Sequence, residues 1–104
     1  MKGIRLDDSQ VLTICKAFRE CFLPNDHIWL FGSRANLAKR GGDIDLYIET
    51  NLSPMQKAMD AKNTFYIYLI KQLGDQKIDI VVNHDQDNKK LIYSIAKEEG
   101  VQLI

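Results

Sequence analysis

The sequence has no long hydrophobic run and only two cysteines. Within its 104 residues no apolar stretch approaches the roughly 18–20 residues that span a bilayer, and residues 1–8 lack the apolar core of a signal peptide. We therefore expect a cytoplasmic protein with no membrane partner. Cys15 and Cys21 lie six positions apart in one expected helix and form no Cys-x-x-Cys pair, so we interpret them as reduced, core-type cysteines.

The chain also lacks an excess of charge of either sign. Fourteen Lys and Arg residues balance fourteen Asp and Glu residues, and the pI is near 6.7. Such a chain has no overall field that would hold it on a nucleic-acid backbone, so general DNA or RNA binding is disfavoured. The acids themselves are biased, because ten of the fourteen are Asp. Aspartate is a poor helix-interior residue and a good cap or metal ligand, so the position of each Asp is informative.

What the chain does have is the composition of one small globular domain. Hydrophobic residues make up 45% and charged residues 27%, close to the averages of soluble proteins. The length predicts a single domain over residues 1–104 and leaves no room for a separate acceptor-binding domain. The sequence leaves the oligomeric state open, including a homo-oligomer.

Hydrophobic periodicity predicts helices that alternate with short strands. Strands are expected over 27–32, 43–49 and 77–82, and 101–103 is a candidate edge strand. The short connection between the first two strands favours an antiparallel return, whereas the long connection to the third favours a parallel crossover through a helix. The sequence therefore predicts an α/β (α+β) fold with a small mixed sheet flanked by helices.

The expected helices have recognisable ends and faces. They cover approximately 7–22, 33–39, 54–73 and 88–99. Ser53 is expected to cap the third of these helices, with Pro54 at its first position, and Asp85 and Asp87 to cap the last. The last helix is expected to carry one apolar side, formed by Leu91, Ile92, Ile95 and Ala96.

Three aspartates are expected to meet at one edge of the sheet. Asp43 and Asp45 are separated by one residue, so on a strand both carboxylates project from the same face, with Cα atoms roughly 6.6 Å apart. The predicted topology brings Asp79, near the start of the third strand, to the same edge. Crowded carboxylates repel one another unless protons or cations neutralise them, and Mg²⁺ or Mn²⁺ prefers carboxylate oxygen. The pattern therefore predicts a divalent-metal site.

A glycine-serine corner is expected opposite these acids. Gly32 and Ser33 join a strand to a helix, where backbone N–H groups and a hydroxyl can face the phosphates of a nucleoside triphosphate. Arg34 is either a phosphate contact or a solvated first-turn residue. An acceptor hydroxyl, helped by metal and by Asp79, would then attack the α-phosphorus and expel pyrophosphate.

These segments together carry a family resemblance. It rests on Phe31-Gly32-Ser33-Arg34-Ala35, Gly42-Asp43-Ile44-Asp45-Leu46 and Ile78-Asp79-Ile80. In this order they resemble the signature of the polymerase-beta-like nucleotidyltransferases, in particular the minimal nucleotidyltransferases, over roughly residues 27–82. The sequence departs from the family pattern at Asn36-Leu37, where a basic residue and glycine are common, and at Gly42, where serine is common.

The resemblance implies a nucleotidyltransferase fold and a set of roles. It implies that Gly32, Ser33 and Arg34 bind the nucleotide and that the acids of the trio serve as metal and catalytic carboxylates, namely Asp43, Asp45 and Asp79. Minimal members of the family are similar to antitoxins that transfer AMP from ATP to a tyrosine of a helical HEPN-type toxin. The implied partners are therefore ATP or another NTP and a HEPN-type toxin.

Two other functions remain open from the sequence. The chain could be a non-catalytic module that binds nucleotide or a toxin. It could also transfer a nucleoside monophosphate to a small molecule or to a nucleic-acid end, as relatives with extra domains do. Our leading hypothesis is a metal-dependent nucleotidyltransferase that modifies a hydroxyl of a partner protein.

Overall fold

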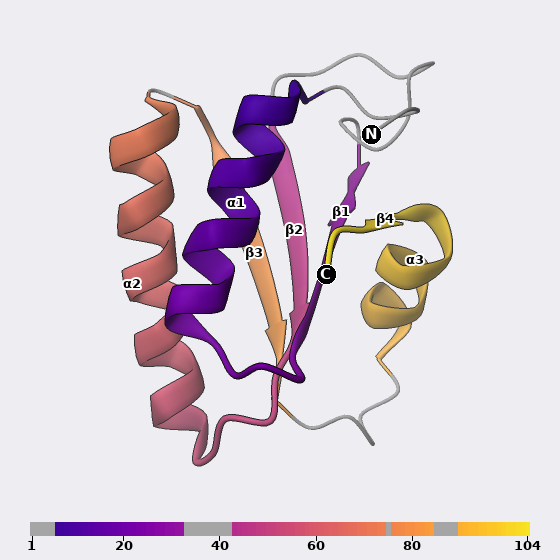
Figure 1. Cartoon of the computed structure of the whole chain (residues 1–104). Helices are drawn as coiled ribbons and strands as arrows, with labels where there is room; N and C mark the ends of the chain where they lie inside the picture. Colours follow the sequence, from indigo (N-terminus) through magenta and orange to yellow (C-terminus); the bar gives the residue numbers. More distant parts are fainter. Residues whose placement is uncertain (1–5, 33–42, 75, 85–89) are drawn as a thin grey trace.

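A computed structural model describes residues 6–32, 43–74, 76–84 and 90–104 of the chain (Figure 1). Helices and strands alternate along most of the sequence, as predicted. Their bounds are α1 Asp8–Cys21, β1 His27–Phe31, β2 Ile44–Glu49, α2 Met55–Leu73, β3 Ile78–Asn83, α3 Leu91–Glu99 and β4 Val101–Gln102.

The strands form one mixed sheet in the order β3-β2-β1-β4. β1 runs antiparallel to β2, while β2 and β3 are parallel, which confirms the two predicted connections. β4 pairs with β1 in the antiparallel direction. The end of β1 therefore lies beside the starts of β2 and β3, at the upper end of the sheet in Figure 1. The expected strand bounds are correct to within one residue.

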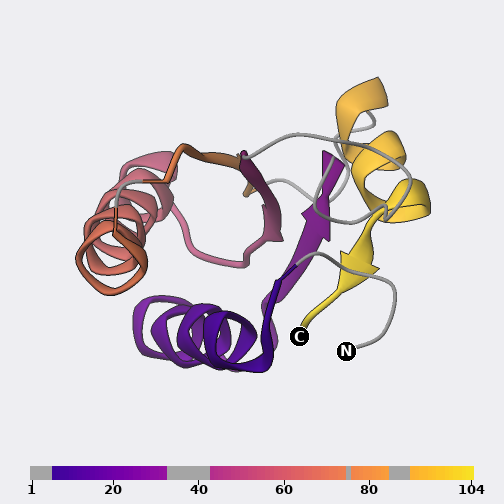
Figure 2. The same cartoon turned by 90° about the horizontal axis from the view of Figure 1, so that it is seen from above.

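Two helices cover one face of the sheet and one short helix covers the other (Figure 2). The larger core lies under α1 and α2, where every second residue of β2 is buried at 0% exposure: Ile44, Leu46 and Ile48. Three phenylalanine rings from α1, its C-cap and α2 pack together there, with centroids 5.0 to 6.1 Å apart: Phe18, Phe22 and Phe65. Alternation along the strands thus assigns this face to the core and leaves the acids on the other.

The second face is closed by an aromatic stack beneath α3. The Tyr47 ring lies 5.4 Å from the rings of both Trp29 and Tyr93 and is fully buried. The Tyr47 hydroxyl donates to Glu49 Oε2 at 2.7 Å and accepts from Asn83 Nδ2 at 3.2 Å. This bonding keeps the buried hydroxyl satisfied and engages Glu49, the remaining acid on this face of β2, in a structural role.

The expected apolar side of α3 is wrong in part. Ala96 is fully buried, but Leu91, Ile92 and Ile95 are 73%, 43% and 36% exposed. The reason is that α3 meets the sheet through its Tyr93 and Ala96 side, where the aromatic stack lies. Three large apolar side chains consequently face away from the described part of the core.

Other expectations about helix ends meet a mixed outcome. The N-cap of α2 is Pro54, whose extended ψ of −179° starts the helix one residue later than expected, so Ser53 does not cap it. The expected helix over 33–39 and the caps Asp85 and Asp87 lie outside the described residues. Cys15 and Cys21 are free thiols, as predicted.

A buried carboxylate, that of Asp26, connects the turn before β1 with the segment after β2. Asp26 is 1% exposed, and its carboxylate accepts hydrogen bonds from the backbone N–H groups of Leu23 at 2.9 Å and Asn51 at 2.8 Å. It also accepts the Thr50 hydroxyl at 2.5 Å. The carboxylate therefore fixes the turn before β1 to the segment that follows β2.

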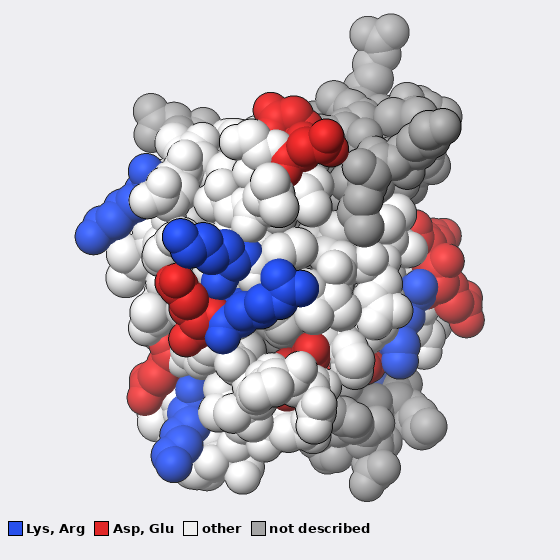
Figure 3. Space-filling view, in the orientation of Figure 1, with Lys and Arg blue, Asp and Glu red and all other residues white. Residues whose placement is uncertain are grey.

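The visible surface carries no broad field of one charge among the described residues. In the view that faces α1 and α2, basic and acidic side chains are interspersed (Figure 3). No helix among the described residues is long and apolar enough to cross a bilayer.

Candidate active site

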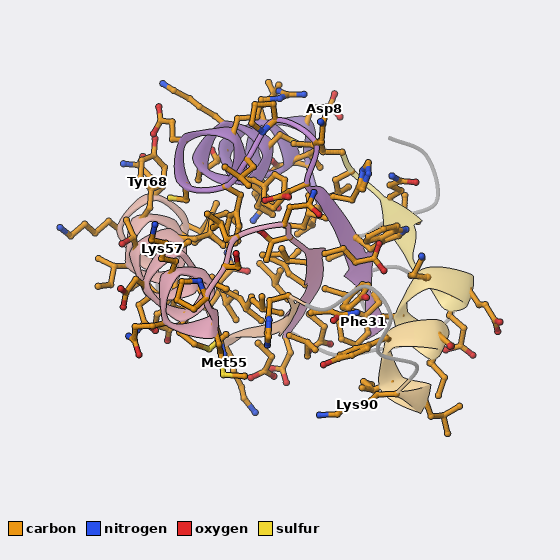
Figure 4. All side chains as sticks on the ribbon, turned by 90° about the horizontal axis from the view of Figure 1, so that it is seen from below. Asp8, Phe31, Met55, Lys57, Tyr68 and Lys90 are labelled. Atoms are coloured by element: carbon orange, nitrogen blue, oxygen red, sulfur yellow. The ribbon has the colours of Figure 1, made fainter. Side chains whose placement is uncertain are left out.

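The register of the sheet places two of the predicted acids side by side. Asp45 of β2 pairs with Asp79 of β3, and on the other side with Phe31 of β1. All three side chains belong to the face of the sheet that α3 covers, and Figure 4 shows Phe31 on that side. The Asp79 carboxyl lies within hydrogen-bonding reach of the Asp45 carboxyl. This much of the predicted acidic cluster is present.

Gly32 lies directly against the Asp45 carboxylate. Its φ of +73° falls in the left-handed region, which favours glycine. A Cβ atom built on Gly32 would overlap Oδ2 of Asp45. Two independent reasons therefore favour glycine at this position: the backbone has a positive φ, and the Asp45 carboxylate occupies the space that a Cβ atom would need.

This double requirement gives a testable substitution. Gly32→Ala should lower the free energy of unfolding by more than the roughly 1–2 kcal/mol that a left-handed conformation costs a side chain, because Asp45 must also move. Gly74→Ala is a control for the positive φ, since Gly74 has φ +79° and ψ −155° but nothing within 4 Å of an added Cβ. Chemical denaturation of both variants measures the difference. Equal losses of unfolding free energy in the two variants would mean that moving the Asp45 side chain has no energetic cost.

Burial and negative neighbours raise the pKa of Asp45 above its ordinary value. Desolvation is the largest cause, followed by the charges of Asp79 and Asp43 and by the hydrogen bond with Asp79. Lys77 opposes the shift with its positive charge. The neighbouring carboxylates thus disfavour the ionised form of Asp45. An added cation would relieve that repulsion.

Asp43 stands slightly apart from the other two acids. It precedes the first residue of β2, and its Oδ2 lies 3.7 Å from Nζ of Lys77. Both side chains are well exposed, so the ion pair is weak. In extended backbone Lys77, two residues before Asp79, lies on the same face as Asp79. The structure places its ammonium group beside the acids as a partial counter-charge.

The donor set fits a hard divalent cation in its chemistry. As they stand, no three acidic, histidine or cysteine side chains among the described residues gather tightly enough to enclose an ion. Mg²⁺, however, retains several waters and commonly takes only one or two protein carboxylates together with substrate phosphates. Asp45 and Asp79 would supply those carboxylates, and Asp43 is close enough to influence the charge of Asp45.

Only part of the predicted phosphate-binding corner lies in the described residues. Gly32 belongs to the site, as the contact with Asp45 demonstrates. Ser33 and Arg34 lie outside the described residues, so their expected contacts with a nucleotide stay predictions.

One feature beside the acids had no signal in the sequence. An open hollow of about 460 Å³ runs along β3 from Ile78 to Val81. On its other side α2 contributes Lys62, Asn63 and Tyr66. Asp79 therefore borders both this hollow and the acidic cluster. Only the packing of α2 beside the edge strand brings these residues together.

The fold and the cluster define a class of protein. A mixed sheet with paired acids on neighbouring strands and a close glycine corner is the α/β arrangement of nucleotidyltransferase domains. The sequence agrees, because residues 9–103 match the family described as Nucleotidyltransferase domain. The chain belongs to this family. A comparison with curated proteins found no match.

Proposed function

We propose that the chain transfers a nucleoside monophosphate, AMP from ATP, to a hydroxyl group of a partner protein. The observation that carries the proposal is the direct pairing of Asp45 with Asp79 beside Gly32. In the reaction the acceptor oxygen forms a bond to the α-phosphorus, and the bond from that phosphorus to the bridging oxygen breaks. Pyrophosphate leaves, and the acceptor proton passes to a carboxylate of the site.

The acids of the site differ in exposure, and we assign them different roles on that basis. Asp79 is exposed, so it can meet an acceptor that arrives from solvent and take its proton. Asp45 is more enclosed and lies against Gly32, so its position is set by packing. Asp45 and Asp79 are proposed as metal ligands with Asp43 in support, and Gly32, Ser33 and Arg34 as the nucleotide corner. A bound Mg²⁺ or Mn²⁺ would neutralise phosphate charge and polarise the α-phosphate.

A protein acceptor is favoured by the surface of α3. Leu91, Ile92 and Ile95 place three exposed apolar side chains on a single short helix. Exposed apolar side chains that cluster in this way mark contacts with other proteins. We propose a HEPN-type toxin as the partner, which would make this chain the antitoxin of the pair.

The reaction can be tested with labelled nucleotide. The full chain, co-expressed with the product of its neighbouring gene, is incubated with Mg²⁺ and ATP labelled at the α-phosphate. We expect label on the neighbour, and loss of that label in Asp43→Asn and Asp45→Asn variants. Label from the γ-phosphate instead would contradict nucleotidyl transfer, since it would indicate a kinase.

The same experiment addresses the binding alternative, which the exposed side of α3 also supports. A non-catalytic module would associate with the neighbour without label, and the acid substitutions would leave that association intact. Label on a small molecule or on a nucleic-acid end would replace the protein acceptor.

A further inference from the structure

The outer edge of β3 is open beside the acidic cluster. β3 is the terminal strand of the sheet, and among the residues that the structure describes no strand pairs with its outer side. Its sequence from Ile78 to Asn83 contains no proline or lysine and one charge, that of Asp79. Native edges are usually blunted by such residues because an open edge invites another strand. This edge is not.

The backbone of β3 alternates between its two sides. The carbonyls of Lys77 and Asn83 accept N–H groups from β2 and the residue after it, at 2.9 and 3.0 Å. In a parallel ladder, residues two apart point their backbone groups to the same neighbour. The N–H and C=O groups of Ile78, Ile80 and Val82 consequently point outward, toward the edge.

The hollow lies along this edge, and two charged side chains, Lys62 and Asp79, line it. Lys62 and Tyr66 of α2 face β3 across it, and Lys62 makes no ion pair with the described residues. Asp79 borders the hollow from the opposite face of the sheet. A strand added here would place one residue opposite Asp79 and its two neighbours toward Lys62.

We propose that the acceptor is an extended peptide segment that adds to the outer edge of β3, with its hydroxyl-bearing residue opposite Asp79 and an acidic residue beside it facing Lys62. Backbone bonds to Ile78, Ile80 and Val82 supply the affinity, and the two charged side chains fix the register. This inference rests on the proposed function, because Asp79 is the carboxylate that would take the acceptor's proton. It names the class of segment that the site modifies, an extended segment outside the helices of the proposed partner.

Binding can be tested without nucleotide and therefore without catalysis. The probe is a nine-residue peptide of alternating valine and threonine, with a central tyrosine flanked by two glutamates. We expect this peptide to slow amide hydrogen exchange at Ile78, Ile80 and Val82 by about tenfold. A matched peptide N-methylated on alternate residues, which cannot form the ladder, should give no protection. Equal binding of the methylated peptide would overturn the proposal.

The register is tested by reversing one charge. Lys62→Glu should weaken the glutamate-flanked peptide by about fivefold and strengthen a lysine-flanked one, as expected for a partly exposed pair. Lys57→Glu, on the exposed part of the same helix outside the hollow, is the matched control and should change neither. No difference between the two variants would overturn the assigned register.

Adding Mg²⁺ and α-labelled ATP separates this inference from the function on which it rests. Protection of the β3 amides without label on any acceptor would contradict the transferase and leave strand addition standing. Label on the tyrosine peptide without protection of these amides would overturn strand addition and leave the transferase standing. Protection by ATP alone at Lys62 and Tyr66 would assign the hollow to the nucleotide and overturn the proposal.

Discussion

Asp45→Asn should reduce nucleotidyl transfer by about a thousandfold or more, the loss expected when a charge that stabilises the transition state is removed. The amide has the size of the carboxylate, so its fit against Gly32 is retained. What the substitution removes is the negative charge beside Asp79. The rate is measured as label transferred from α-labelled ATP. Asp60→Asn, an exposed change of the same chemistry on α2, should keep the wild-type rate.

The same substitution should make the protein more stable at neutral pH. Burial and the charges of Asp79 and Asp43 disfavour ionised Asp45, and Asn carries no charge to be disfavoured. The site is partly open to solvent, so the gain should stay below about 1 kcal/mol. Because the pKa is raised in the folded state, the stabilising contribution of protonated Asp45 is full below the ordinary value of 3.8 and is lost as pH rises through the folded pKa. The advantage of the variant should therefore grow over that window.

Magnesium provides a readout that does not depend on turnover. Mg²⁺ should raise the melting temperature of the wild-type chain by relieving the repulsion among the acids. It should raise that of the Asp45→Asn variant much less. If both proteins respond equally, the ion binds somewhere other than the acidic cluster.

Asp26→Ala should lower the free energy of unfolding by about 3–4 kcal/mol. The carboxylate is nearly inaccessible, and its removal leaves the N–H groups of Leu23 and Asn51 and the hydroxyl of Thr50 without their acceptor. In a domain of this length the loss corresponds to a decrease of roughly 15–25 °C in melting temperature. Calorimetry or thermal denaturation measures it directly.

A second aspartate provides the comparison for this prediction. Asp7 caps α1 and accepts Gln10 N–H at 2.8 Å, but it is exposed. Asp7→Ala should cost only about 1 kcal/mol, the usual value of a helix cap. If the two variants lose the same stability, the burial of Asp26 does not set its contribution. Asp26 lies at the end of the sheet remote from the acids, so the variant that remains folded should keep its transfer activity.

The sheet and two acids of the site could be predicted from local pattern. Alternation fixes which face of β2 bears Asp45 and which bears Ile44 and Leu46, because side chains on a strand point to opposite sides in turn. The unequal lengths of the two connections then distinguish an antiparallel from a parallel neighbour. Together these rules bring Asp79 beside Asp45 without any knowledge of long-range packing.

Other features depend on contacts that no local pattern encodes. The helical spacing of Leu91, Ile92 and Ile95 indicates an apolar side, but it does not indicate which side of α3 the aromatic stack will occupy. The closeness of Gly32 to Asp45 follows from the register in which Phe31 of β1 pairs with Asp45 of β2. The hollow beside β3 likewise depends on where α2 passes. Distant segments determine each of these arrangements.

In β2, aliphatic side chains that face the core alternate with side chains that face the acidic site. Catalysis and folding therefore depend on the same backbone register. Loss of a single residue within Ile44–Glu49 would exchange the two faces of the strand beyond the deletion, turning isoleucines toward the face that α3 covers and carboxylates toward the phenylalanine core. A frame-preserving deletion in this strand should therefore give an insoluble protein rather than a folded, inactive one. Length variation among relatives should accordingly be confined to the connecting segments, while β2 tolerates substitution only.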